Sequence, residues 1–174
     1  FLYNFQQKIC VDTQNISGYT DAVTLNTIIE DKGKTINDVV KMASLVQAEA
    51  ADTKDMYVVS SVFYNRLATI DTGGISPFGD LDLDKLKSDA TLYYPYSAQD
   101  DIPSEIAATF KSNYNTYDFS GLPPGAICNP GLDAIDAAIN PDDTNYYYFC
   151  HRSATTTQEA KAYYASTFAE HQSN

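Results

Sequence analysis

The sequence has no tryptophan, no long apolar run and few basic residues. Its 174 residues include 11 lysines and arginines against 23 aspartates and glutamates, a net charge of −12. A surface this acidic excludes nucleic acid and anionic membrane surfaces as partners, because both are recognised by basic patches. No apolar stretch approaches the roughly 18 residues of a membrane-spanning helix. Cys10, Cys128 and Cys150 are too few and too widely spaced for a disulfide framework or a cysteine metal site.

The chain begins at Phe1 without an initiating methionine or a signal-peptide pattern, so we expect it to be a piece of a longer protein. It contains enough apolar material for one domain. Hydrophobic residues make up 44% of it and aromatic residues 13%, and a chain of this length buries roughly 70% of its extended surface. Fourteen residues are tyrosines, whose apolar ring and polar tip suit a groove for a partly polar ligand.

The apolar spacing predicts helices followed by a small sheet. Thr35 is a suitable N-cap for a helix over residues 36–50, in which apolar side chains recur every three or four positions. Similar spacing predicts helices over 53–67 and 132–139, a short C-terminal helix, and helical segments near Leu2 and Val23. The aromatic run 146–150 predicts a buried strand, with a partner at 162–165. This order indicates an α+β fold, with helices packed on a small β-sheet.

Half of the excess negative charge lies in residues 71–105, which hold eight acidic residues and two lysines, a net charge of −6. Prolines and glycines in this segment predict loops and turns. Asp80, Asp82 and Asp84 alternate as at the start of a calcium-binding EF-hand loop. Lys85 stands where that loop needs glycine, however, and Thr91 where it needs glutamate. A solvated acidic loop is therefore the better interpretation.

Glu49 is the acidic residue with the most unusual setting. It flanks the apolar face of the helix over 36–50 and has an alanine on each side, which leaves room for a ligand. A carboxyl group in partly apolar surroundings suits a general acid. From the spacing alone, a solvated glutamate at a helix end explains the position better.

Two other chemistries have weaker support. Cys128 or Cys150, with His151 and Asn129, could form a thiol hydrolase site, but no helix N-terminus is clearly presented to Cys128. His151 and His171 are the only histidines of the chain and stand apart, which is a poor basis for a metal site. We expect no metal and no cofactor.

Several short blocks follow one another along the chain. They are ASLVQAEA at 43–50, VSSVFYNRL at 59–67, SDAT at 88–91, YNTY at 114–117, GLPPGAI at 121–127, NPG at 129–131, NP at 140–141 and YYYF at 146–149. Together, and in this order, they resemble the endolytic murein transglycosylases of the MltG/YceG-like family. One departure is Ala90, where the family usually has proline.

The resemblance implies a lytic transglycosylase that cuts nascent peptidoglycan strands internally. Such an enzyme cleaves the β-1,4 bond between N-acetylmuramic acid and N-acetylglucosamine, and leaves a 1,6-anhydro end. The family's catalytic acid is the second glutamate of a motif that often reads Glu-x-Glu, which corresponds to Gln47 and Glu49 here. Because the muramoyl 6-hydroxyl attacks its own sugar, one carboxyl group can act as general acid and then base, without the second carboxylate of ordinary glycosidases.

The resemblance also implies which other residues form the site. The expected substrate-binding residues are Asn115, Tyr114, Tyr117, Asn65 and Ser88. The expected supporting residues are Arg66, Asp89 and Asn129, with Arg66 paired to Asp89. Ala162 stands where many members have the histidine of a Gly-Gly-His-x-Phe block, and His171 matches a later, structural histidine.

The family implies a fold and a location as well. We expect residues 1–174 to form a single YceG-like catalytic domain with a lysozyme-like or lytic-transglycosylase-like groove, without the membrane anchor and LysM-like subdomain that family members carry. The full-length protein is expected at the extracytoplasmic face of the bacterial cell membrane, on a single-pass anchor. Its partners would be peptidoglycan glycan strands and peptidoglycan synthases (penicillin-binding proteins). The alternative is a glycan-binding cell-wall module that has lost catalysis.

Overall fold

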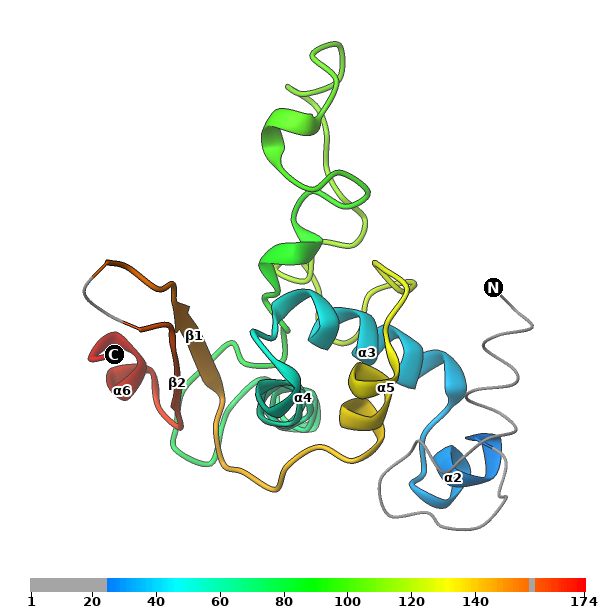
Figure 1. The fold of residues 1–174 in the computed structure, drawn as a ribbon, viewed down its shortest axis with the longest axis vertical. Coiled ribbons are helices and arrows are strands. Elements are labelled where there is room, and N and C mark those ends of the chain that lie inside the picture. Colours follow the sequence, from blue (N-terminus) through cyan, green and yellow to red (C-terminus); the bar gives the residue numbers. More distant parts are fainter. Residues whose placement is uncertain (1–24, 157–158) are drawn as a thin grey trace.

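The structure, a computed structural model, describes residues 25–156 and 159–174. The helical segment predicted near Leu2 lies outside this part of the chain, and so does Cys10. The segment predicted from Val23 overlaps the first described helix, over residues 25–31. The elements are α2 (Leu25–Asp31), α3 (Ile36–Glu49), α4 (Thr53–Leu67), α5 (Leu132–Ile139), β1 (Tyr148–Arg152), β2 (Lys161–Ala165) and α6 (Phe168–Gln172). Short 3-10 turns are η3 (Ile70–Thr72), η4 (Asp89–Thr91) and η5 (Gln99–Asp101). The fold is thus a set of helices with a small antiparallel sheet beside them (Figure 1).

The core lies where α3, α4 and α5 pack together. Val39, Ala43 and Val46 of α3 recur at helical spacing and are fully buried. They meet Phe63 of α4 and Ile139 of α5, which are buried as well. Burial of each large apolar side chain contributes about 1.5–3 kcal/mol, so this three-helix contact fixes the end of α3 in space.

The two long helices begin where predicted, because each is capped locally, and α3 ends at Glu49, one residue earlier than predicted. The Oγ1 atom of Thr35 accepts the backbone N–H of Asp38 at 3.2 Å. The carboxylate of Asp52 accepts the N–H of Asp55 at 2.9 Å. Only residues 50–52 separate α3 from α4, so Glu49, the last residue of α3, lies at a sharp turn between two buried helices.

The sheet is a hairpin in which β1 and β2 run antiparallel, from the pair Tyr148–Ala165 to the pair Arg152–Lys161. The prediction of a buried strand at 146–150 is partly wrong. The strand begins two residues later, and only its first residue, Tyr148, is buried. The reason is that side chains of α4 bind the carbonyl groups of Tyr146 and Tyr147, which draws the chain before β1 onto α4.

The acidic segment forms loops and turns, as predicted. The stretch that contains η5 extends away from the helices as a long arm, green in Figure 1. The aspartates at the base of the segment do not form a calcium site. Asp82 pairs with Lys85 and Lys87, at 3.1 and 2.6 Å, and Asp80 accepts the N–H of Phe168 at 2.9 Å.

Within residues 25–156 and 159–174, no cluster of three or more histidine, cysteine or carboxylate side chains is arranged to hold a metal ion. In the same part of the chain, no helix combines the length and the apolarity needed to cross a membrane.

Candidate active site

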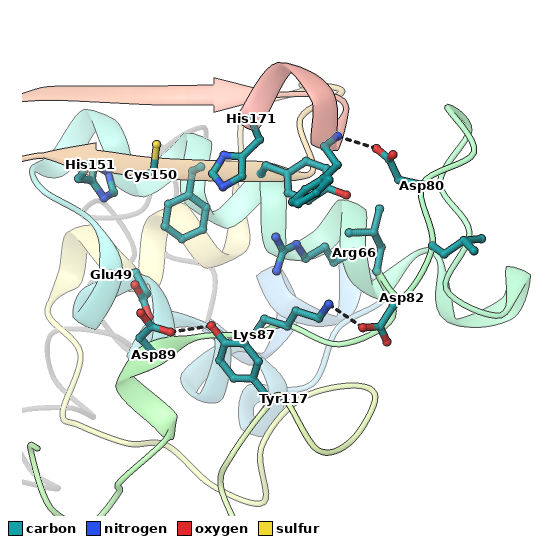
Figure 2. Close-up of a pocket in the computed structure, with 15 residues that line it drawn as sticks. Glu49, Arg66, Asp80, Asp82, Lys87, Asp89, Tyr117, Cys150, His151 and His171 are labelled. Atoms are coloured by element: carbon teal, nitrogen blue, oxygen red, sulfur yellow. Dashed lines mark hydrogen bonds and ion pairs between the residues drawn. The ribbon is translucent and has the colours of Figure 1, made fainter. Parts of the chain in front are cut away.

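A groove of about 730 Å³ opens between the end of α3, the loop before η4, strand β1 and helix α6 (Figure 2). Its polar walls include Glu49, Arg66, Asp89, Tyr117, His151 and His171. Leu83, Tyr148, Phe149 and Phe168 supply apolar surface. The groove thus offers both hydrogen-bonding groups and ring surfaces, which suits a ligand that is partly polar.

Glu49 is half-buried at one end of this groove. Its Oε1 atom accepts a hydrogen bond from the Ser88 hydroxyl at 2.5 Å and another from the Ala90 N–H at 3.3 Å. Both donors bind the same oxygen. Among the described residues, no hydrogen bond uses the second oxygen, Oε2. The carboxyl group is therefore held by one oxygen, and the other is available to a ligand.

Buried hydroxyl groups hold the turn that carries Ser88. The N–H of Ser88 donates to Thr116 Oγ1 at 2.9 Å, and the N–H of Thr116 donates to Thr91 Oγ1 at 3.0 Å. The Thr91 hydroxyl in turn donates to the Ser88 carbonyl at 2.6 Å. The YNTY block thus supports Glu49 through its threonine. The sequence carries no signal for this role beyond the position of Thr116 between Asn115 and Tyr117.

Tyr117 lines the groove and donates its hydroxyl to Asp89 Oδ1 at 2.6 Å. Burial and this bond raise the pKa of Tyr117 to about 12. The phenol therefore stays protonated at neutral pH and keeps its bond to Asp89. This bond fixes one wall of the groove.

Arg66 reaches the groove from α4, but the predicted ion pair with Asp89 is wrong. Its Nε and Nη1 atoms donate to the carbonyls of Tyr147 and Leu86, at 2.7 and 2.6 Å. Asp89 is bound to Tyr117 instead. Burial lowers the pKa of Arg66 to about 10, so the side chain remains charged at neutral pH. It ties the start of β1 to the loop before η4 and places a positive charge beside the groove.

Five predicted site residues do not line this groove. Ser88, predicted to bind substrate, is buried and holds Glu49 instead. Asn65 donates to the carbonyls of Thr144 and Tyr146, both at 2.9 Å, which fastens the chain before β1 to α4. The Tyr114 ring packs on Tyr94, with the centroids 4.5 Å apart. Asn115 donates to Asp118 at 2.9 Å and lines a separate hollow of about 320 Å³. Asn129 is exposed in the turn before α5.

The structure does not bring together the residues of the alternative thiol hydrolase site. Cys128 lies outside the groove, and its thiol contacts the Ser44 carbonyl at 3.4 Å. Burial raises the pKa of Cys128, which disfavours the reactive thiolate. Cys150 lines the groove, but the neighbouring imidazole of His151 binds the Asp55 carboxylate at 2.7 Å.

Gln47 has a structural contact of its own. Its Oε1 atom accepts the N–H of Gly131, the residue that precedes α5, at 3.1 Å. A glutamine oxygen makes this bond without adding a second charge near Glu49. The departure from Glu-x-Glu thus leaves the end of α3 attached to the NPG turn.

Comparisons with known proteins identify the family of this chain. The model of the YceG-like family matches residues 4–174, so the chain belongs to the YceG-like family. An endolytic murein transglycosylase from Streptococcus pneumoniae serotype 2 (strain D39) is 33% identical over 150 residues, which are 84% of this chain and 24% of that protein. An endolytic murein transglycosylase from Bacillus subtilis (strain 168) is 32% identical over 136 residues, 78% of this chain and 33% of that protein.

A solved structure is similar as well. The crystal structure of a YceG-like protein from Listeria monocytogenes superposes with a TM-score of 0.63 and 29% sequence identity. The match covers 84% of this chain and 42% of that one. The chain therefore has a fold found in its family, and it spans about a quarter to a third of the length of the curated relatives named above.

Proposed function

We propose that this chain is the catalytic part of an endolytic lytic transglycosylase, with Glu49 as its general acid and base. Its substrate would be nascent peptidoglycan, cleaved at the β-1,4 bond between N-acetylmuramic acid and N-acetylglucosamine to leave a 1,6-anhydro end. Its relatives are named endolytic murein transglycosylases. The observation that carries the proposal is the Glu49 carboxyl group, held through one oxygen by Ser88 and open to the groove through the other.

The geometry suits a reaction with a single carboxyl group. Protonated Glu49 donates its proton to the glycosidic oxygen as the bond to the anomeric carbon breaks. The resulting carboxylate then takes the proton of the muramoyl 6-hydroxyl, whose oxygen bonds to that same carbon. The proton balance closes without water, so no second carboxylate is needed to activate one. The bond from Ser88 keeps the carboxyl group in position for both proton transfers.

The groove supports a lysozyme-like mode of binding, in which a glycan strand lies across an open surface. Aspartates and an arginine stand on its walls beside tyrosine, phenylalanine and histidine rings. The sugar would be held by hydrogen bonds and ring contacts, with little contribution from the net charge of −12. Tyr117, as a lining residue, remains a predicted substrate contact. Asn65, Tyr114 and Asn115 could bind sugar only where a strand runs beyond the groove.

The wider proposals follow from the family. Residues 1–174 would be one catalytic domain of a longer protein, anchored by a single membrane pass and acting outside the cytoplasm. Peptidoglycan synthases would be its partners, since they make the strands that it cuts.

A digest of uncrosslinked glycan strands tests the proposal against the binding-module alternative. The wild-type chain should release fragments with anhydro ends, and Glu49→Gln should release none while its melting temperature stays unchanged. Binding of strands by the wild-type chain without any cleavage would favour the non-catalytic module.

A further inference from the structure

A buried carboxylate holds one histidine of the groove in place. Asp55, in the first turn of α4, has a side chain only 5% exposed. Its Oδ2 atom accepts the backbone N–H of Ala51, with the nitrogen 2.7 Å away, and also lies 2.7 Å from His151 Nε2. Its Oδ1 atom accepts a hydrogen bond from the Tyr164 hydroxyl. Asp55 thus joins the turn after Glu49 to both strands of the hairpin.

This contact determines which nitrogen of His151 is available. Because Asp55 takes the hydrogen on Nε2, the neutral imidazole presents a bare acceptor at Nδ1. Among the described residues, no hydrogen bond uses Nδ1. The side chain is 25% exposed and lines the groove. Figure 2 shows His151 and Glu49 at the same end of the groove, away from Asp80 and Asp82.

A purely structural role for His151 explains this geometry less well than a role in binding a ligand. Asp55 already accepts bonds from Ala51 and Tyr164, so one donor reaches each oxygen without the imidazole. The ring is also held on a second side by Phe149, with centroids 5.6 Å apart. An oriented, partly exposed acceptor in the same groove as the proposed catalytic carboxyl group is an arrangement that can bind a ligand.

We propose that His151 is a substrate-binding residue of this groove, which accepts at Nδ1 a hydrogen bond from a hydroxyl or amide N–H group of the glycan next to the bond that Glu49 cleaves. Asp55 and Tyr164 are its positioning residues. The inference rests on the proposed function, since it names a contact to that same substrate.

The sheet register offers a second position for the imidazole. His151 lies directly opposite Ala162 in the hairpin, and directly opposed residues of an antiparallel pair have side chains on the same face, about 5 Å apart. A histidine at position 162 would therefore reach the same face of the sheet from β2.

Two substitutions of His151 distinguish a substrate-binding role from a purely structural one. His151→Gln keeps a donor for Asp55 near the Nε2 position and removes the Nδ1 acceptor. His151→Asn keeps a polar atom near the Nδ1 position and loses the bond to Asp55. Lys161→Ala, at an exposed position of β2 outside the groove, is the control for changes in the hairpin. Each variant of the 174-residue chain is assayed for kcat and KM on uncrosslinked glycan strands, and for its melting temperature.

We expect His151→Gln to keep its melting temperature and to raise KM about tenfold, the effect of one lost hydrogen bond, with kcat little changed. The inference is overturned if His151→Gln has the KM of the Lys161→Ala control, because the histidine is then only a structural partner of Asp55. It is overturned equally if His151→Asn lowers the melting temperature while His151→Gln keeps both constants.

A second test moves the imidazole from position 151 to position 162 and looks for recovered activity. His151→Ala should raise KM, and the double variant His151→Ala with Ala162→His should recover most of the loss by supplying the imidazole from the opposite strand. No recovery in a folded double variant contradicts the cross-strand argument. Failure of the proposed function itself is distinct, since the wild-type chain would then make no anhydro-ended product and no KM could be measured.

Discussion

Ser88 donates a 2.5 Å hydrogen bond to Oε1 of Glu49. The two residues belong to different sequence blocks, one at the end of α3 and one before η4. Ser88 is buried and bound through its own N–H to Thr116, so a third block fixes the donor. The blocks therefore converge on one carboxyl group, which gives a physical reason for their occurring together.

Removal of that donor should slow the reaction. Ser88→Ala leaves Glu49 without its shortest hydrogen bond, and a bond to a charged group contributes about 1.5–3 kcal/mol. We expect kcat to fall at least about tenfold, with a small change in KM. Ser104→Ala, at an exposed position of the arm, is the matched control. A Ser88→Ala enzyme with the kcat of this control would show that Ser88 does not position Glu49.

Asp55 and Asp52 should differ in their effect on stability. Asp52→Ala removes an N-cap, which costs about 1 kcal/mol. Asp55→Ala removes the partner of Ala51, His151 and Tyr164 at a buried position, which costs about 3 kcal/mol or more. Urea denaturation of both variants measures the two losses. Equal losses would contradict the central structural role assigned to Asp55.

Tyr117 should make stability depend on pH in the alkaline range. Its pKa is raised from 10.0 to about 12 in the folded chain. The unfolded chain therefore loses this proton first, so the stabilisation is complete below pH 10 and is lost as the pH rises towards about 12. Tyr117→Phe cannot titrate. The difference in unfolding free energy between the wild-type chain and Tyr117→Phe should shrink over this range, and a constant difference would contradict the assignment.

The helical part of the fold could be predicted from the sequence because its signals are local. Thr35 and Asp52 cap α3 and α4 within three residues of themselves, and the apolar spacing marks the buried faces. The start of β1 could not be predicted in this way. It depends on Asn65 and Arg66 of α4, which bind the two carbonyls before the strand.

The candidate site could likewise be predicted from the sequence only in part. Glu49 was identified through the family motif, and the structure places it in the groove. The contacts that orient it were not predictable, because Ser88 and Thr116 meet only in the folded chain. Asp55 had no signal in the sequence beyond its place in the first turn of a helix. Its role depends on His151 and Tyr164, which the hairpin brings to it from the far end of the chain.

The most direct test of Glu49 in an intramolecular cleavage is a digest of glycan strands in water enriched in heavy oxygen. Mass spectrometry of the fragments then distinguishes transglycosylation from hydrolysis. We expect wild-type fragments that are lighter by one water than hydrolysis products and carry no heavy oxygen at the new end, and no new fragments from Glu49→Gln. Heavy oxygen at the new ends, or continued cleavage by Glu49→Gln, would contradict the account.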